Sequence, residues 1–220
     1  MKRINVLVLV LCAGIISAFA QQNEMTPMSD ADIAAFEKKI AAEMQKINTI
    51  ESDFTQIKRM TTTERTVTSS GRFYYQREGK VCLDYFAPKK QQIIINDNNL
   101  KMVSGGKTRV QNIAFNRLLK ETKEIVSASM TGNLQAMKRN YKMEYFQSPR
   151  EYLVKITPIN PAIKTVLDEV YIYFDKRDLL VNRMRVIEAS KNPEVKNEDY
   201  TEYMFQNKRI NVHIPASRFN

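Results

Sequence analysis

The feature that most limits the fold is a long series of short runs of alternating or β-branched residues, broken by turn residues, from Ile50 onward. This pattern is typical of consecutive antiparallel strands. We expect strands over residues 50–60, 66–76, 80–86, 91–96, 100–103, 141–146, 152–157, 166–174, 180–188, 200–205 and 210–214, with turns at 105–106, 175–178 and 207–208. A sheet of about ten to twelve strands cannot stay flat, so a half-open barrel is predicted.

One helix is predicted before the strands. Ser29 stands where an N-cap belongs, and Asp30 and Asp32 follow in the first turn. Apolar residues then recur at steps of three and four, which places them on one helical face: Ile33, Phe36, Ile40, Met44 and Ile47. Residues 23–28, before this helix, are expected to be a disordered leader.

A second helical region interrupts the strands between residues 115 and 138. Its first part has an apolar face formed by Phe115, Leu118, Leu119 and Ile125, and a shorter second part carries Leu134 and Met137. Gly132 and Asn133 separate the two parts. The two helical regions are the only candidates to close the open side of the sheet. The predicted fold class is α+β, mainly β: an incomplete antiparallel β-barrel, or half-barrel, covered by a helical lid.

The N-terminus has the features of a cleaved export signal. Lys2 and Arg3 form a charged segment, residues 4–16 are almost wholly apolar, and Ala18-Phe19-Ala20 is a small-x-small cleavage signature. The apolar run is shorter than the roughly 20 residues that span a bilayer, so a retained signal anchor is the less favoured alternative. Residues 1–20 are predicted to be a signal peptide cleaved after Ala20, and residues 21–220 a single exported domain.

The formal net charge is +10. A basic protein can bind nucleic acid, anionic membrane surfaces or acidic partners. Here the basic residues are interleaved with acidic ones, as at 121–124 and 175–178, and an exported protein rarely meets nucleic acid. No nucleic-acid partner is therefore expected. A solvated surface with a mild attraction for anionic headgroups or acidic partners is the favoured interpretation.

The residues that carry enzyme or metal chemistry are scarce. His213 is the only histidine, and Cys82 is the only cysteine left once Cys12 is removed with the signal, so no intramolecular disulfide is expected. No Gly-x-Ser-x-Gly motif occurs. Asp168 and Glu169 are adjacent, so on a strand they point to opposite faces. We predict no catalytic residue, no metal site and no cofactor.

An aromatic row on one strand is the most distinctive local pattern. Strand parity places Phe73, Tyr75 and Arg77 on one face. In one interpretation this is an ordinary core face, with Arg77 emerging at the strand end. In the other, the row is a cavity wall, and Arg77 donates hydrogen bonds to helix-terminal carbonyls of a lid.

Three runs of sequence resemble the periplasmic outer-membrane lipoprotein carriers of the LolA type: Phe54-Thr55-Gln56, residues 70–77, and residues 83–97. Their order and spacing match over roughly residues 30–215. The resemblance implies an incomplete β-barrel covered by a helical lid, which takes lipoproteins from an inner-membrane transporter to an outer-membrane receptor without a cofactor. It also implies that Arg77 is the arginine that latches the lid. The chain departs from the family pattern at Glu78, where proline is common, and at Leu83, where a tryptophan or similar bulky residue is common.

The resemblance and the helical faces together give two sets of candidate residues. The ligand-binding candidates are Phe54, Phe73, Tyr75, Arg77, Leu83, Tyr85, Met184 and Val186, and the lid candidates are Ile33, Phe36, Ile40, Met44, Leu118 and Leu119. The expected ligand is the acyl chains of a lipoprotein, and the expected state is a monomer. Two alternatives remain: a binding module of the same fold for another lipid or for envelope sensing, and an adaptor that binds a protein partner and no ligand. A cavity too small for an acyl chain would favour the adaptor.

Overall fold

The computed structural model describes residues 24–61, 63–77, 79–96, 99–190 and 198–220. The predicted signal peptide therefore lies outside the described residues. The described strands form one twelve-stranded sheet in the order β1-β8-β9-β10-β11-β12-β2-β3-β4-β5-β6-β7. Their bounds are β1 Thr26–Pro27, β2 Thr49–Met60, β3 Arg65–Gln76, β4 Lys80–Ala87, β5 Gln91–Asn96, β6 Asn99–Ser104, β7 Lys107–Asn112, β8 Tyr141–Gln147, β9 Glu151–Pro158, β10 Leu167–Asp175, β11 Val181–Glu188 and β12 Tyr200–Ile210.

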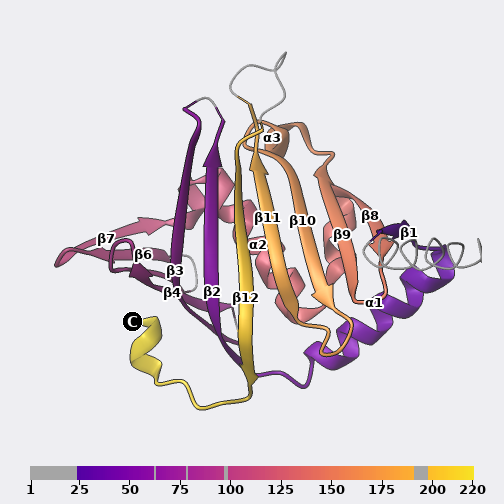
Figure 1. The fold of residues 1–220 in the computed structure, drawn as a ribbon, viewed down its shortest axis with the longest axis horizontal. Helices are drawn as coiled ribbons and strands as arrows, with labels where there is room; N and C mark the ends of the chain where they lie inside the picture. Colours follow the sequence, from indigo (N-terminus) through magenta and orange to yellow (C-terminus); the bar gives the residue numbers. More distant parts are fainter. Residues whose placement is uncertain (1–23, 62, 78, 97–98, 191–197) are drawn as a thin grey trace, which may run out of the picture.

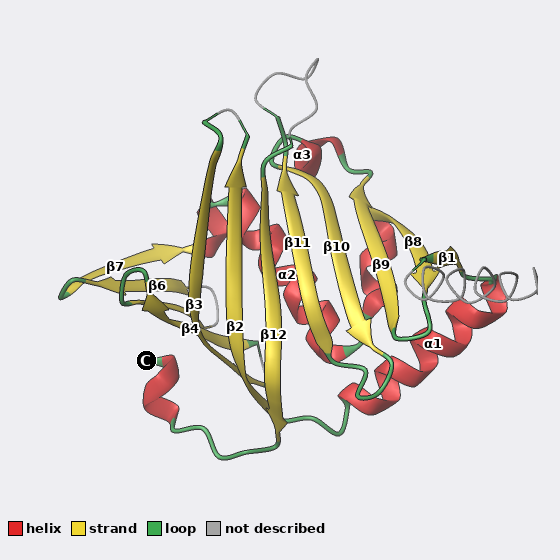
Figure 2. Cartoon of the chain, in the orientation of Figure 1, coloured by secondary structure: helices red, strands yellow, loops and turns green. Residues whose placement is uncertain are grey.

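Every strand pairing in this sheet is antiparallel. The sheet is not closed, because β1 and β7 form its two edges and do not pair with each other. Figure 1 shows these edges at opposite ends of the molecule, and Figure 2 shows the helices gathered mainly behind the sheet. The predicted half-barrel with helices on one face is confirmed.

Strand β7 was not predicted, and three predictions for the strands and the residues before α1 were wrong. Residues 24–28 are not all disordered, since Thr26 and Pro27 pair with β8 as the short strand β1. The turn expected at 207–208 is a bulge inside β12, whose pairing with β2 shifts register between Gln206 and Arg209. Asn207 adopts a positive φ of 53° there, which asparagine tolerates better than most residues. The strand expected over 210–214 is absent beyond Ile210.

Helix α1, Asp30–Met44, begins as predicted. The Ser29 side chain accepts a hydrogen bond from the Asp32 amide, which satisfies one of the amides left free at a helix start. Phe36 lies against the rings of Tyr152 and Phe174, with ring centroids 4.5 and 5.6 Å apart. Helix α1 therefore covers the β9 and β10 part of the concave face.

Helix α2, Arg117–Thr131, covers a different part of the sheet. It follows the 3-10 segment η3, Ile113–Phe115, and precedes the 3-10 segment η4, Leu134–Arg139. Phe115, predicted on the helical face, instead lies in η3 and is 89% exposed. Gly132 ends α2 with a φ of 70°, and a Cβ there would lie 2.7 Å from the Ile40 carbonyl oxygen. Only glycine fits this close approach of α2 to α1.

The two faces of the sheet carry separate apolar clusters. The larger cluster lies between the concave face and the helices and includes Phe73 and Tyr75. The smaller lies on the opposite face, where Tyr74, Cys82 and Ile94 are covered by Ile214 and Phe219. Phe219 belongs to the C-terminal 3-10 segment η5, Ala216–Phe219, and a one-turn helix α3, Pro161–Lys164, lies between β9 and β10 in the chain. The C-terminal segment therefore packs on the convex face.

Candidate functional site

An apolar cavity of about 120 Å³ lies between the concave face of the sheet and α2. One wall comes from β3 to β5, β11, β12 and the turn before β4, and the other comes from α2. The lining residues are Phe73, Tyr75, Gly79, Val81, Leu83, Ile95, Val181, Met184, Val186, Tyr203 and Phe205 on the sheet side and Leu119, Thr122, Lys123, Val126, Ser127, Ser129 and Met130 on α2. This volume is smaller than the roughly 300–1,000 Å³ of typical ligand pockets.

Five of the predicted ligand-binding residues line this cavity: Phe73, Tyr75, Leu83, Met184 and Val186. The sheet register explains why they meet. Phe73 lies directly opposite Leu83 on β4, and Met184 lies opposite Tyr203 on β12. Directly opposed residues of antiparallel strands share a face, so the alternating pattern along each strand places these side chains on one wall.

The other two predicted aromatic residues, Phe54 and Tyr85, do not line the cavity. They are buried on the same face, with their ring centroids 5.0 Å apart and edge to face. Burial raises the pKa of Tyr85, and the neighbouring Tyr203 raises it further. Their rings pack directly against each other, so these two residues belong to the packed core beside the cavity.

The predicted lid residues divide between the two helices. Leu119 lines the cavity, whereas Leu118 is partly buried against the core outside it. Phe36, Ile40 and Met44 of α1 are almost completely buried, and Ile33 packs beside them. None of the α1 residues lines the cavity. The cover of the cavity is therefore α2, while α1 packs as part of the core over a neighbouring part of the sheet.

Arg77, which follows β3, joins that strand to the end of α1. Its Nη2 donates to the carbonyl oxygens of Met44, Gln45 and Ile47 at 3.0, 2.7 and 2.6 Å, and its Nε donates to Asn48 Oδ1 at 3.0 Å. The expected hydrogen bonds to helix-terminal carbonyls are thus present. They hold α1 rather than α2, so Arg77 does not touch the helix that covers the cavity.

Two buried carboxylates join the helices to β8. Glu37 of α1 accepts hydrogen bonds from Tyr145 and Gln135 and forms an ion pair with Lys138. Glu121 of α2 accepts a hydrogen bond from Tyr141. Burial raises the pKa of both tyrosines, and the glutamate partners raise it further. Each phenol therefore stays neutral and donates, which satisfies a carboxylate that would be costly to bury alone.

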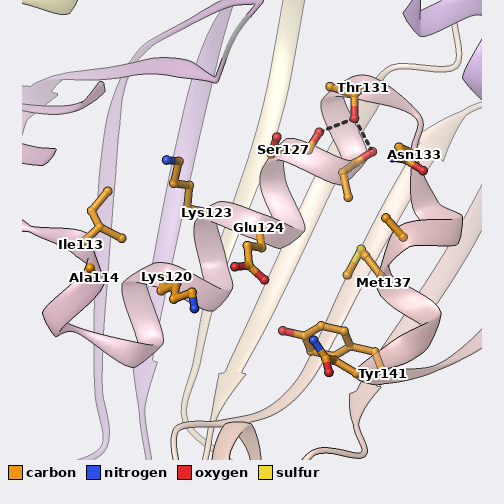
Figure 3. Close-up of a pocket in the computed structure, with 13 residues that line it drawn as sticks. Ile113, Ala114, Lys120, Lys123, Glu124, Ser127, Thr131, Asn133, Met137 and Tyr141 are labelled. Atoms are coloured by element: carbon orange, nitrogen blue, oxygen red, sulfur yellow. Dashed lines mark hydrogen bonds between the residues drawn. The ribbon is translucent and has the colours of Figure 1, made fainter. Parts of the chain in front are cut away.

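A second pocket, of about 430 Å³, lies on the solvent side of α2 (Figure 3). Its walls come from η3, α2, η4 and the first residue of β8. It is more polar than the cavity, with Lys120, Glu124 and Tyr141 among its lining residues. Lys123 and Ser127 line both spaces. Only the flank of α2 therefore separates this pocket from the apolar cavity.

The rest of the described structure bears on other classes of function. No helix in the described ranges is both long and apolar enough to cross a membrane. Among residues 24–220, leaving aside those that are not described, no three His, Cys, Asp or Glu side chains are grouped as metal ligands would be. Cys82 is fully buried, and burial raises the pKa of its thiol to about 12.

Residues 45–220 match the family described as outer membrane lipoprotein carrier protein LolA. This chain belongs to the LolA family. The match begins just after α1, so it contains Arg77, α2 and the whole cavity. It also contains the C-terminal segment that covers the convex face.

One curated protein and two solved structures illustrate what this chain is similar to. An outer-membrane lipoprotein carrier protein of Methylococcus capsulatus is 34% identical over 85 residues, which cover 39% of this chain and 35% of that protein. The match thus spans about a third of the relative's length. Two solved structures are similar at lower identity. One is a putative outer membrane lipoprotein-sorting protein domain from Vibrio parahaemolyticus, with 11% identity, coverage of 84% of this chain and 95% of that one, and a TM-score of 0.48. The other is a LolA superfamily protein from Nitrosomonas europaea, with 7% identity, coverage of 84% and 97%, and a TM-score of 0.43.

Several cavity residues of this LolA-family chain were missed by sequence reasoning. On α2, Leu119 was predicted, but Val126, which follows it at helical spacing, was not, because the face proposed from sequence continued through Ile125. On β12, Tyr203 and Phe205 alternate as strand residues do and were not singled out. The signal was present in both elements. Which of several apolar positions on a helix borders a cavity depends on how the helix lies on the sheet.

Proposed function

We propose that this LolA-family protein is a periplasmic carrier that holds the acyl chains of lipoproteins between the concave face of the sheet and α2. Residues 1–20 would direct export and be cleaved after Ala20, leaving residues 21–220 as a single, monomeric domain. An inner-membrane lipoprotein-releasing transporter would be the donor and an outer-membrane receptor the acceptor. Neither a cofactor nor a catalytic step is part of this proposal.

The apolar cavity beneath α2 carries the proposal. Its sheet wall consists of aromatic and aliphatic side chains, and these include Phe73, Tyr75, Leu83, Met184 and Val186. Each acyl methylene removed from water stabilises the complex by about 0.8 kcal/mol. Met130 and Met184 add flexible side chains that suit a wall able to repack around different chains.

The size of the cavity determines the mechanism. At about 120 Å³, it lies below the roughly 300–1,000 Å³ range of ligand pockets, so an acyl chain enters only if α2 moves away from the sheet. The ligand and α2 then compete for the same wall. The net free energy of binding is the free energy gained from the ligand's contacts minus that lost when α2 leaves the wall. This competition keeps a long acyl chain from binding so tightly that it could not be released.

The small cavity also supports a second candidate function, an adaptor that keeps α2 closed, binds a partner protein and takes no ligand. The two candidates differ in one respect that can be measured. A carrier binds acyl chains under α2, and an adaptor does not.

The test uses two neighbouring leucines of α2. Leu119 lines the cavity and Leu118 does not, although both are partly buried. A dansyl-labelled, N-terminally triacylated peptide should bind the wild type and the Leu118→Asp variant, whereas Leu119→Asp should bind at least about tenfold more weakly because a carboxylate must be desolvated against the chain. Absence of binding by the wild type would reject the carrier and support the adaptor. Equal loss in both variants would reject the cavity as the site.

Mass spectrometry of the protein purified from periplasm separates the carrier from a module for other lipids. Triacylated proteins should copurify with the wild type and be depleted from Leu119→Asp. Free lipids alone in the wild type would contradict lipoprotein carriage.

A further inference from the structure

The two edges of the sheet are treated differently by the chain. At one edge, β8 is partly covered by β1, where Thr26 and Pro27 pair with Gln147 and Phe146. Pro27 has no amide hydrogen, so this edge is poorly suited to accept another strand. At the other edge, all six residues of β7 are exposed and none is proline. Within the described ranges, β7 pairs only with β6.

The hairpin turn before β7 determines which backbone groups face the open edge. Gly105 and Gly106 form a two-residue turn with φ of 56° and 73°, as a type I′ turn requires. Ser104 and Lys107 close this turn, so they form a hydrogen-bonded pair, and the pattern alternates along the register. The amides of Lys107 and Arg109 therefore point toward β6. Those of Thr108 and Val110 point outward, where no other described strand lies.

The surroundings of this edge are basic and partly apolar. Residues 99–116 contain Lys101, Lys107 and Arg109 and no acidic residue. None of these three forms an ion pair with a residue in the described part of the chain. Val110 is 64% exposed, and Phe115, just beyond the strand, is 89% exposed. Exposed apolar side chains beside free backbone groups are typical of a docking surface.

The charges select the occupant. In an antiparallel pairing of β7 with β7 of a second copy, Lys107 and Arg109 of both copies would lie on one face, and like charges across strands are unfavourable. An acidic strand in the same place would lie opposite these cations. We propose that β7 is a docking edge for an extended, acidic segment of a partner protein, which adds to the sheet as a further strand. Figure 1 shows β7 at the far end of the sheet from α1, projecting away from the helices.

The test measures binding of a short fluorescein-labelled peptide of alternating glutamate and valine by anisotropy. The wild type should bind it, and a peptide of alternating lysine and valine should not bind. Val110→Pro removes one outward amide and should weaken binding at least about tenfold, whereas Val110→Thr keeps the amide and should bind within about threefold of the wild type. Lys107→Glu combined with Arg109→Glu should abolish binding. The matched control is Arg139→Glu combined with Lys164→Glu, which reverses two exposed cations elsewhere and should leave binding unchanged.

Amide hydrogen exchange provides a readout that does not depend on any variant. On peptide binding, exchange at Thr108 and Val110 should slow while Lys107 and Arg109, already bonded to β6, change little. In Val110→Pro, retained protection at Lys107 shows that the hairpin is intact. Binding that Val110→Pro leaves unchanged, or protection of α2 instead of β7, would overturn the proposal. So would a β7-dependent dimer by light scattering, which would assign the edge to a second copy.

Discussion

Arg77 donates hydrogen bonds to backbone carbonyls at the C-terminal end of α1. The last turn of α1 contains no basic residue, although cations there interact favourably with the free carbonyls and the helix dipole. The Arg77 guanidinium supplies this charge from the residue after β3, thirty or more residues along the chain, and donates to three carbonyls. Its planar fork fits several acceptors, which a lysine ammonium does less well.

Replacing Arg77 should therefore loosen α1 more than the cavity. Arg77→Leu should lower the free energy of unfolding by about 1–2 kcal/mol, because charged hydrogen bonds at a partly exposed site are lost. Amide exchange should rise around residues 44–48. Arg77→Lys keeps the charge but lacks the planar guanidinium. Its free energy of unfolding should therefore lie between those of the wild type and Arg77→Leu. If acyl binding and transfer change while exchange at the end of α1 does not, the assignment of Arg77 to α1 is wrong.

At the residue scale, the sequence alone predicts which side chains of β3 share a face. Phe73 and Tyr75 face the helices and Tyr74 faces away, because successive strand residues alternate. The function of each inward residue could not be predicted. Phe54 and Phe73 have the same character in sequence, yet only Phe73 borders empty space, because neighbouring rings fill the region around Phe54.

At the scale of elements, the C-terminal segment acts as a cover for the convex face. Phe219 is 2% exposed, its carbonyl accepts a hydrogen bond from Asn96 at 3.0 Å, and Arg218 pairs with Asp84 at 3.0 Å. Beneath it lies Cys82, which is fully buried. The thiol of Cys82 therefore reports whether this segment is in place.

Removing the Phe219 ring should expose Cys82. In the wild type, a thiol reagent at neutral pH should react very slowly, because the thiolate is the reactive form and burial raises the pKa of this thiol to about 12. Phe219→Ala should speed the reaction at least about tenfold through local opening. Phe86→Ala, on the same strand as Cys82 but 51% exposed, is the control and should leave the rate unchanged. Equal rates in all three proteins would show that the segment does not protect the convex face.

Most strands and the helices α1 and α2 could be predicted from sequence, because the period of their apolar residues is local information. Two of the exceptions have a common cause. Strand β1 exists only because β8 is there to pair with it, and β12 continues through a bulge because β2 supplies a partner on both sides of residues 207–208. Short or irregular strands depend on neighbours that are distant in sequence.

For the whole molecule, the buried tyrosines predict the response to alkali. Burial, together with neighbouring glutamates or a tyrosine, raises the pKa of Tyr85, Tyr141 and Tyr145 above its usual value of about 10. The folded state then keeps these protons at a pH where the unfolded chain loses them. The contribution of these tyrosines to stability should be constant below pH about 10 and should fall above it, by about 1.4 kcal/mol per pH unit for each such tyrosine.

Phenolate absorbance, followed together with circular dichroism, measures this response. Part of the ten tyrosines should ionise only as the protein unfolds. Tyr145→Phe should make the loss of stability with pH less steep. The prediction fails if all the tyrosines ionise near pH 10 while the protein remains folded.

By itself, the sequence determined an antiparallel sheet that must curve, the inward face of its strands, and two helical covers, because each of these follows from local periodicity and capping. The tertiary structure alone decided that α2 covers the cavity, that Arg77 holds α1 instead, and that the empty space is about 120 Å³. These outcomes depend on contacts between residues far apart in the chain and on how completely side chains fill the space between them, which no local pattern encodes.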